Sequence, residues 1–421
     1  MPYLIHGAAV GIAAAFVIAK RRGQTERWLQ ALEIATAISV AGALLALTSV
    51  TVLVDFSKAY LHAGRAVLAD PSTLYDCTRA QCFVNIPIVA VLFVPLALMN
   101  PSAAGVVFSV AGAVLLVAAV RRLARGAAAD IIVWLAILSG PIYYSVRIGN
   151  TTHMLLLPLM VAFDRLAAGR QAAAGAILAG LSLLKPPLAL FLPFFLLRRN
   201  FRAAIAMAGC AAVAVAASVA FFGVELHWFW FREFVVKQGA APIAAYNIQS
   251  VNGFVAHLLT RGQLANWYPV DAGALFKPLS AGLAAALVAA VGIAAWRAGP
   301  SHGEAARRVE LWLVLCLTVL IAPIAWTHYY LLMLIPCAAL VSAHASLGWR
   351  SLVGLVAAIA LMAPPVLVLD VRSRIGNALY ERILVSHYFL GGVVLLAVLI
   401  AERLEATHRD PGPLIPSRAT E

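Results

Sequence analysis

Charged side chains are scarce in this chain. Asp, Glu, Lys and Arg make up 12% of the 421 residues and apolar residues 63%, with a mean hydropathy of +0.92. Soluble domains carry about 25% charged and about 45–50% apolar residues. This composition excludes a soluble globular protein, a disordered chain and a disulfide-stapled secreted scaffold. Because several apolar runs approach the ~20 residues that cross a bilayer core, we expect an all-α, polytopic transmembrane helical bundle.

The motifs of nucleotide and metal chemistry are missing as well. The sequence has no P-loop and no glycine-rich fingerprint after a predicted strand, so we expect neither ATP hydrolysis nor Rossmann-type binding of a nucleotide sugar. No set of His, Cys, Asp and Glu has metal-ligand spacing, so we expect no metal and no cofactor. Cys77 and Cys82 share one polar loop, where they form either a disulfide or two free thiols.

Acidic residues are few beside basic ones: 18 Asp and Glu stand against 31 Lys and Arg, for a net charge of +13. No basic helix with interleaved aromatics is present, so nucleic acid is not an expected partner. Basic residues of membrane proteins collect in cytoplasmic loops. The first apolar run, 3–19, is followed by Lys20, Arg21 and Arg22, whereas a signal peptide has its basic residues before the apolar core. We therefore interpret 3–19 as a span that ends in the cytoplasm.

The basic clusters predict about 11–13 spans if all of them face the cytoplasm. The predicted spans are 3–19, 31–54, 103–120, 129–147, 151–164, 172–184, 187–197, 203–222, 280–296, 310–325, 329–346, 351–369 and 386–401. Segment 83–99 then has to be re-entrant or lie along the membrane surface. Segment 172–197 has to form a hairpin bent at Lys185, because Pro186 and Pro187 break a helix.

These spans belong to one integral-membrane domain, 1–401. The external loops are predicted at about 55–102, 223–279 and 370–385. The remaining tail, 402–421, is rich in proline and charge, and we expect it to be cytoplasmic and disordered.

Asp55 ends a long apolar run, at the edge of a predicted membrane span. An ionisable residue there is costly and is expected to have a structural or functional role. One interpretation is an interfacial carboxylate paired with Lys58 or Arg65. The other is a general base, because partial removal from water raises the pKa of a carboxyl group toward the range that proton abstraction needs.

Three cationic candidates follow in the chain. Lys185 lies among apolar residues, where it either snorkels to the membrane surface or binds a phosphate. Arg147 belongs to a polar stretch at an external tip, which is either a turn or a group of donors for phosphate or sugar. His328 is flanked by aromatic residues at a span end; it either anchors the interface, donates to a phosphate or assists a base.

The remaining candidates are polar or aromatic residues near these positions. Each is suited to hydrogen bonding or stacking with a sugar, but polar loops and interfacial aromatics explain them equally well. The candidate substrate-binding residues are Tyr60, Asn150, Asn247, Gln249, Ser250, Asn252, Trp326 and Tyr329.

The order and spacing of several short motifs match a known pattern. In chain order the motifs are Asp55-Phe56, Tyr60-x-x-Ala63-Gly64-x-Ala66, Leu74-Tyr75-Asp76, Leu184-Lys185-Pro186, Gln249-Ser250-Val251-Asn252-Gly253 and Pro323-Ile324-x-Trp326-x-His328-Tyr329. Together they resemble the GT-C superfamily of integral-membrane glycosyltransferases, and more narrowly glycosyltransferase family 87. That family includes mycobacterial polyprenol-phosphate-mannose-dependent mannosyltransferases. The chain departs from it at Gly149-Asn150-Thr151-Thr152, where the family usually shows Gly-Gln-x-Asn, and has the extra span 3–19.

The resemblance implies a sugar transferase of the bacterial inner membrane with its active site on the periplasmic side. Its donor would be mannose or another hexose on polyprenyl phosphate, and its acceptor a lipid or glycan. Asp55 would deprotonate the acceptor, with inversion at the sugar, while Lys185, Arg147 and His328 stabilise the leaving phosphate. The alternative is a transporter or flippase of a lipid or lipid-linked sugar without covalent chemistry. The sequence leaves the oligomeric state open.

Overall fold

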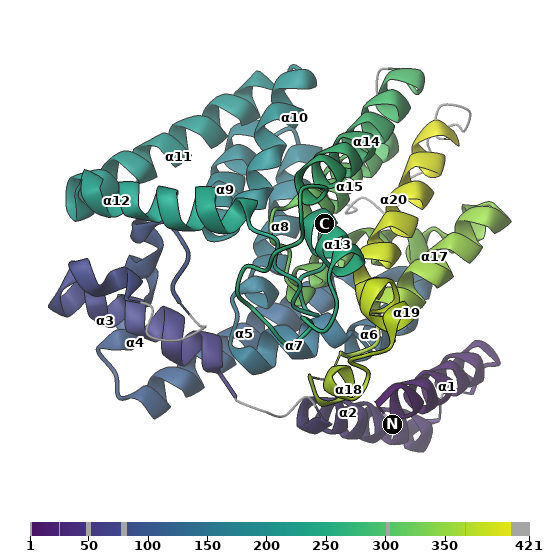
Figure 1. The fold of residues 1–421 in the computed structure, drawn as a ribbon. Helices are drawn as coiled ribbons and strands as arrows, with labels where there is room; N and C mark the ends of the chain where they lie inside the picture. Colours follow the sequence, from purple (N-terminus) through teal and green to yellow (C-terminus); the bar gives the residue numbers. More distant parts are fainter. Residues whose placement is uncertain are drawn as a thin grey trace.

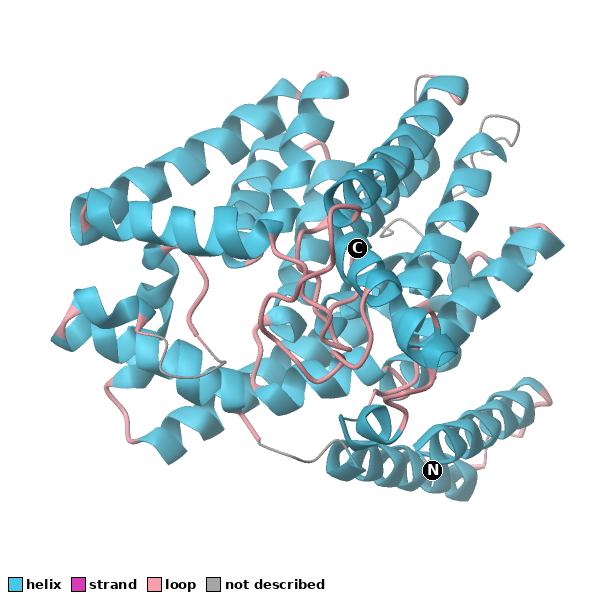
Figure 2. Ribbon diagram, in the orientation of Figure 1, coloured by secondary structure: helices cyan, strands magenta, loops and turns pink. Residues whose placement is uncertain are grey.

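The computed structural model describes residues 2–24, 26–47, 52–76, 82–299, 304–366 and 368–405. Over these residues the chain is helical and has no β-strand (Figure 2). One isolated antiparallel bridge joins Ile248 to Trp326. The predicted all-α class is confirmed.

Within the described residues, five helices are long and apolar enough to cross a membrane, or six if a pair bent by 51° counts as one span. Exposed valines and isoleucines along two of these helices, such as Val114, Ile205 and Val213, give the outward surface that lipid contact requires. The long helices are α2 (Arg27–Leu47), α5 (Pro101–Leu123), α11 (Phe201–Phe222), α14 (Phe276–Arg297) and α20 (His387–Glu405), and the bent pair is α6 (Ala129–Ile137) with α7 (Gly140–Ile148).

The remaining predicted spans are helices as well, and several of them are shorter than the five helices named above. They are α1 (Pro2–Arg21), α8 (Thr152–Ala167), α9 (Gln171–Leu184), η5 with α10 (Pro186–Leu190 and Phe191–Leu197), α15 (Glu304–Ile321), η7 with α16 (Thr327–Met333 and Leu334–Ser342) and α17 (Trp349–Met362). Helix α15 is buried over most of its length, and the core packs around it and α16. Its central position is visible in Figure 1.

The predicted bend at Lys185 is present. Helix α9 ends at Leu184, Lys185 leaves the helical conformation, and Pro186 begins the next turn. Proline cannot continue the hydrogen-bond ladder of the preceding helix. Helix α9 returns close to α11, where a Cβ on Gly175 would lie 2.2 Å from the Ala203 carbonyl oxygen.

Segment 83–99 contains no full-length helix, in agreement with the prediction. It forms two short pieces, η3 (Pro87–Phe93) and α4 (Val94–Ala97). They pack against α3 (Leu61–Ala69), and Gly64 allows the close approach because a Cβ there would lie 2.6 Å from the Phe93 carbonyl oxygen. Cys82, at the start of this segment, is disulfide-bonded. Cys77 lies outside the described residues.

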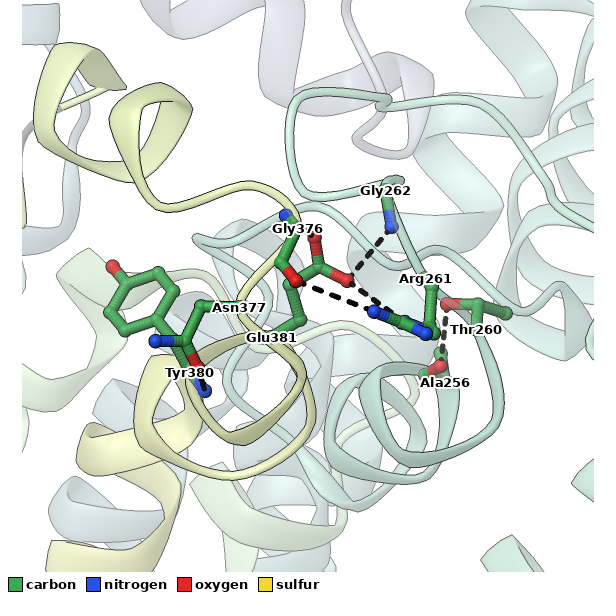
Figure 3. Close-up of polar contacts among 8 residues, drawn as sticks. All are labelled: Ala256, Thr260, Arg261, Gly262, Gly376, Asn377, Tyr380 and Glu381. Atoms are coloured by element: carbon green, nitrogen blue, oxygen red, sulfur yellow. Dashed lines mark hydrogen bonds and ion pairs between the residues drawn. The ribbon is translucent and has the colours of Figure 1, made fainter.

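Two of the predicted external loops are held together by one buried carboxylate. The second loop contains α12 (Val224–Trp230), η6 (Phe231–Gln238) and α13 (Val251–Leu259); the third contains α18 (Val368–Ser373) and α19 (Ala378–Arg382). Glu381 accepts hydrogen bonds from the Gly262 and Gly376 amides, at 3.0 and 2.6 Å, with the Arg261 guanidinium 3.9 Å away (Figure 3). The two loops therefore form one connected surface.

Helix α20 runs past the predicted last span, 386–401, into the segment predicted as the tail. Helix α20 continues to Glu405, and Arg403 is buried. The Arg403 guanidinium donates to the Glu310 carboxylate at 2.9 Å, and Arg198 pairs with the same carboxylate. A buried charge needs a partner, so this ion pair explains why the helix extends past the last apolar residues. The rest of the predicted tail, 406–421, lies outside the described residues.

The N-terminal helices α1 and α2 form a pair at one edge of the bundle (Figure 1). They attach to α6 through polar contacts with its first turn and its middle. Lys20 donates to Asp130 at 3.1 Å, and Trp134 donates to Glu33 at 3.0 Å. The extra N-terminal span of the sequence is therefore an added helix packed on the bundle.

Candidate active site

Asp55 lies where the start of the predicted external loop 55–102 meets the end of α7. Leu53, two residues earlier, has a left-handed backbone with φ of 56°, and its amide donates to the Arg147 carbonyl at 2.7 Å. The helical stretch η1 (Phe56–Tyr60) then begins directly after Asp55. This backbone contact holds the carboxylate beside the C-terminal turn of α7.

Gly149 turns the chain at that point. It ends α7 in the left-handed region with φ of 70°, and a Cβ there would lie 2.7 Å from the Phe56 Cβ. Glycine adopts this conformation without the steric cost that other residues incur. The turn directs Asn150 toward Asp55.

Asn150 connects the carboxylate to the cation. Its amide nitrogen donates to Asp55 Oδ2 at 2.9 Å and to the Tyr60 hydroxyl at 3.3 Å. Its amide oxygen accepts from Lys185 Nζ at 3.1 Å and from the backbone and hydroxyl of Thr152. An amide has two N–H donors and one acceptor oxygen with two lone pairs. These contacts use that capacity in full, so Asn150 is a positioning residue in this arrangement rather than a group open to substrate.

Lys185 is only 6% exposed, and it projects from the break after α9. Besides its bond to Asn150, its ammonium lies 4.6 Å from the centre of the Tyr329 ring, a cation–π geometry. The Leu184 carbonyl beside it accepts from Asn85 at 2.9 Å, and the Asn85 carbonyl accepts from the Tyr75 hydroxyl at 2.7 Å. The segment predicted as the first external loop thus braces the turn that carries Lys185.

The surroundings of Asp55 change its acidity. Its partial removal from water raises the pKa of the Asp55 carboxyl above its ordinary value, and this is the largest effect. The hydrogen bond from Asn150 and the positive charge of Lys185 act in the opposite direction. A raised pKa makes the ionised carboxylate a stronger base.

His328 lies in the same cluster. Its ring stacks on Tyr144 at 6.0 Å between centroids and lies 5.1 Å from the Tyr329 ring. The residue is 2% exposed, and among the described residues neither ring nitrogen has a hydrogen-bond partner. Buried polar groups are nearly always paired, so these two nitrogens beside Lys185 are candidates for contact with a water molecule or a ligand.

Arg147 is buried on the last turn of α7, yet its side chain makes no ion pair with the described residues. A buried guanidinium without a carboxylate partner is costly. Such a side chain is suited to an anionic ligand, since guanidinium groups bind phosphate well.

Sequence reasoning missed Tyr144 and Trp267. Asn247 donates to the Tyr144 hydroxyl at 2.7 Å and accepts from the Trp267 indole at 2.9 Å, so the second external loop fixes the ring that stacks on His328. The available signal was the spacing of Tyr144 and Arg147, three residues apart on one helix, which places them on the same face.

Two of the predicted sugar ligands belong to the scaffold. Gln249 is fully buried; its amide nitrogen donates to the Tyr246 and Val385 carbonyls, and its oxygen accepts from the Phe389 amide. Ser250 is fully buried as well and caps α13 by accepting from the Gly253 amide. Neither side chain offers a surface to a substrate in this arrangement, because backbone groups use its hydrogen bonds.

Of the other residues predicted to bind the sugar, some lie in the cluster around Asp55 and Lys185 and some do not. Tyr60 and Tyr329 lie within the cluster, as described, and Tyr60 stacks on Phe93 at 4.7 Å between ring centroids. Asn252 donates to the Gly239 carbonyl at 3.5 Å. Trp326 is held by its backbone bridge to Ile248.

Together, the cluster contains one carboxylate that can accept a proton, Asp55, and three side chains that can donate hydrogen bonds to an anion: Lys185, Arg147 and the imidazole of His328. The described residues contain no group of three or more His, Cys, Asp or Glu side chains placed to hold a metal ion. The arrangement is suited to a reaction in which a hydroxyl loses a proton while negative charge develops on a phosphate.

Comparison with known protein families gives a match to Glycosyltransferase family 87 over residues 83–323. The range includes Arg147, Asn150 and Lys185, whereas Asp55 and His328 lie outside it. No curated protein and no solved structure matches the chain.

Proposed function

The chain belongs to glycosyltransferase family 87, and on this premise we propose that it transfers a hexose from a polyprenyl-phosphate donor to a lipid or glycan acceptor. Because the family consists of glycosyltransferases, its match favours covalent sugar transfer over transport without chemistry. The observation that carries the proposal is the Asn150 amide, which links the Asp55 carboxylate to the Lys185 ammonium.

The proposed reaction is a single displacement. Asp55 takes the proton of the acceptor hydroxyl, and the acceptor oxygen forms a bond to the anomeric carbon. The bond from that carbon to the phosphate oxygen breaks on the opposite face, and polyprenyl phosphate leaves with the bonding electron pair. The configuration at the anomeric carbon is inverted, because one displacement occurs.

The basic groups support a phosphate leaving group. Its negative charge grows as the bond breaks, and donors fixed in a buried site stabilise such charge strongly. Lys185 supplies an ammonium, Arg147 a guanidinium without a carboxylate partner, and His328 two ring nitrogens without partners among the described residues. A free hydroxyl leaving group would not need three basic residues.

We place this chemistry on the periplasmic side of the inner membrane. The disulfide of Cys82 supports that placement, since disulfides persist in oxidising compartments. The basic clusters at the opposite helix ends support it as well, among them Arg121 and Arg122 in the last turn of α5.

The donor can be tested with the purified full-length enzyme. It is incubated with a mixture of lipid acceptors and a radiolabelled hexose, supplied either on polyprenyl phosphate or on a nucleoside diphosphate. We expect labelled product and free polyprenyl phosphate from the first donor only. Product formed from the nucleotide sugar alone would contradict the proposal.

A further inference from the structure

The direction of one hydrogen bond determines what the Tyr144 hydroxyl can do. The Trp267 indole N–H can only donate, and it lies 2.9 Å from one end of the Asn247 amide. That end is therefore the amide oxygen, and the other end is the amide nitrogen. The nitrogen can only donate, and it lies 2.7 Å from the Tyr144 hydroxyl oxygen. Tyr144 is consequently the acceptor in this bond, and its own proton is not used there.

A second donor fills the same oxygen. Burial raises the pKa of the Tyr246 hydroxyl well above its ordinary value, and a hydrogen bond with Tyr144 acts in the same direction. A hydrogen bond raises the pKa of a hydroxyl when that hydroxyl donates its proton, so Tyr246 donates and Tyr144 accepts. The Tyr144 oxygen has two lone pairs, and these two bonds use both of them. Its proton has no acceptor among the described residues, so the hydroxyl is fixed as a donor.

The Tyr144 hydroxyl lies beside the proposed phosphate ligands. Its ring stacks on His328 and is partly exposed. Arg147 follows three residues later on α7, so the two side chains lie on one face of the helix. The Arg147 guanidinium is within electrostatic range of the Tyr144 hydroxyl. No described residue accepts a hydrogen bond from Arg147, and its nitrogens are not shielded from solvent. This face of α7 therefore borders accessible space.

The fixed direction of the Tyr144 hydroxyl favours a partner that has no proton to donate. A sugar hydroxyl both donates and accepts, so it can pair with another hydroxyl in either direction. A phosphate oxygen only accepts, so it needs a donor whose proton is not engaged elsewhere. Hydrogen bonds to an anionic oxygen are also about twice as strong as bonds between neutral groups. The positive charge of Arg147 favours an anion at the same place.

We propose that the Tyr144 hydroxyl donates a hydrogen bond to an oxygen of the leaving phosphate. The inference rests on the proposed function, in which polyprenyl phosphate is the leaving group. It adds a fourth donor to the three phosphate ligands named above. The residues that fix the direction of this donor belong to the segment predicted as the second external loop, and they are positioning residues: Asn247, Trp267 and Tyr246.

Two lipids separate the phosphate contact from contacts with the lipid chain: undecaprenyl phosphate and undecaprenol, which has the same chain without the phosphate. Their affinities for the purified full-length protein are measured in detergent by microscale thermophoresis. Tyr144→Phe keeps the ring that stacks on His328 and removes only the hydroxyl. We expect it to weaken binding of undecaprenyl phosphate at least about tenfold, as the loss of one hydrogen bond to a charged group predicts. Binding of undecaprenol should not change.

Tyr143→Phe is the matched control, because it removes a hydroxyl from the adjacent residue. The Tyr143 hydroxyl donates to the Ile137 carbonyl at 2.7 Å, across the bend between α6 and α7. Its loss should lower the Tm and leave the affinity for undecaprenyl phosphate unchanged. Equal losses of affinity in Tyr143→Phe and Tyr144→Phe would show that any disturbance of α7 weakens binding, and would overturn the assignment.

A double substitution tests the direction of the hydrogen bond. Trp267→Phe removes the N–H that fixes the Asn247 amide, so the amide can turn over and accept the Tyr144 proton. We expect Trp267→Phe to weaken binding of undecaprenyl phosphate, with no further loss when Tyr144→Phe is added. Losses that add in the double variant would show that Trp267 acts independently of the Tyr144 proton, and would contradict its positioning role.

The remaining outcomes separate this inference from the proposed function. Unchanged affinity of Tyr144→Phe for undecaprenyl phosphate would overturn the inference alone. A loss confined to the hexose-bearing donor would also overturn it, because the hydroxyl would then contact the sugar. Equal affinity of the unmodified protein for undecaprenyl phosphate and undecaprenol would instead contradict the polyprenyl-phosphate donor itself.

Discussion

Asp55 and Asn150 are joined by a hydrogen bond of 2.9 Å although 95 residues separate them in the chain. The bond orients the carboxylate that we propose as the base, and the oxygen of the same amide holds the Lys185 ammonium. The proposed base and the proposed phosphate-binding cation thereby contact opposite ends of one amide group. Such mutual positioning is what catalysis by orientation requires.

This link predicts a change in pH dependence. A hydrogen bond to the ionised form lowers the pKa of a carboxyl group, so its removal in Asn150→Leu raises the pKa of Asp55 further. The base must be ionised to act, and activity is lost as the pH falls through that pKa. We therefore expect the acidic limb of the kcat/KM profile to move to higher pH. Asn100→Ala, which removes only the cap of α5, should leave the limb in place.

Loss of the buried ammonium should weaken stabilisation of the leaving phosphate. We expect Lys185→Gln to reduce kcat/KM by about 10²–10³-fold, the usual effect of removing one preorganised donor. Lys185→Arg should recover part of the loss, since it keeps the charge but not the shape. Lys277→Gln, at an exposed position, is the control. Equal rates for Lys185→Gln and Lys277→Gln would exclude a role for Lys185.

Gly149 should be essential for the turn that delivers Asn150. Gly149→Ala places a Cβ 2.7 Å from the Phe56 Cβ, on a left-handed backbone. The backbone cost alone is about 1–2 kcal/mol, so we expect a lower Tm together with reduced activity. Thermal unfolding in detergent measures the first effect. Gly180→Ala meets no atom within 4 Å and should not lower the Tm; a similar fall in both variants would contradict this explanation.

The ion pair that extends α20 should be important for stability. Removing one partner of a buried pair costs about 3–5 kcal/mol when it leaves an uncompensated charge. Arg198 still pairs with Glu310 in Arg403→Met, so we expect a smaller fall in the free energy of unfolding, of about 1–3 kcal/mol. Arg308→Met breaks a pair with Glu304, which is more than half exposed, and should cost less than about 1 kcal/mol. Comparable losses in the two variants would show that Glu310 does not depend on Arg403.

The sequence predicted the parts of the site that depend on local signals. Asp55 and Lys185 are isolated charges next to apolar runs, and the prolines after Lys185 predicted the bend. The roles of Asn150 and Gln249 could not be predicted, because they depend on which distant groups fill their hydrogen bonds. Gln249 bonds to Val385 and Phe389, more than a hundred residues later. The extension of α20 was missed for the same reason, since the partner of Arg403 is on α15.

The most direct test of the account is single-turnover transfer of a radiolabelled hexose from polyprenyl phosphate by Asp55→Asn. The account predicts a loss of about 10²–10⁴-fold, the contribution of a general base, with donor binding retained and with Asp271→Asn as active as the unmodified enzyme. Transfer by Asp55→Asn at the unmodified rate would contradict the assignment of the base and with it the proposed mechanism.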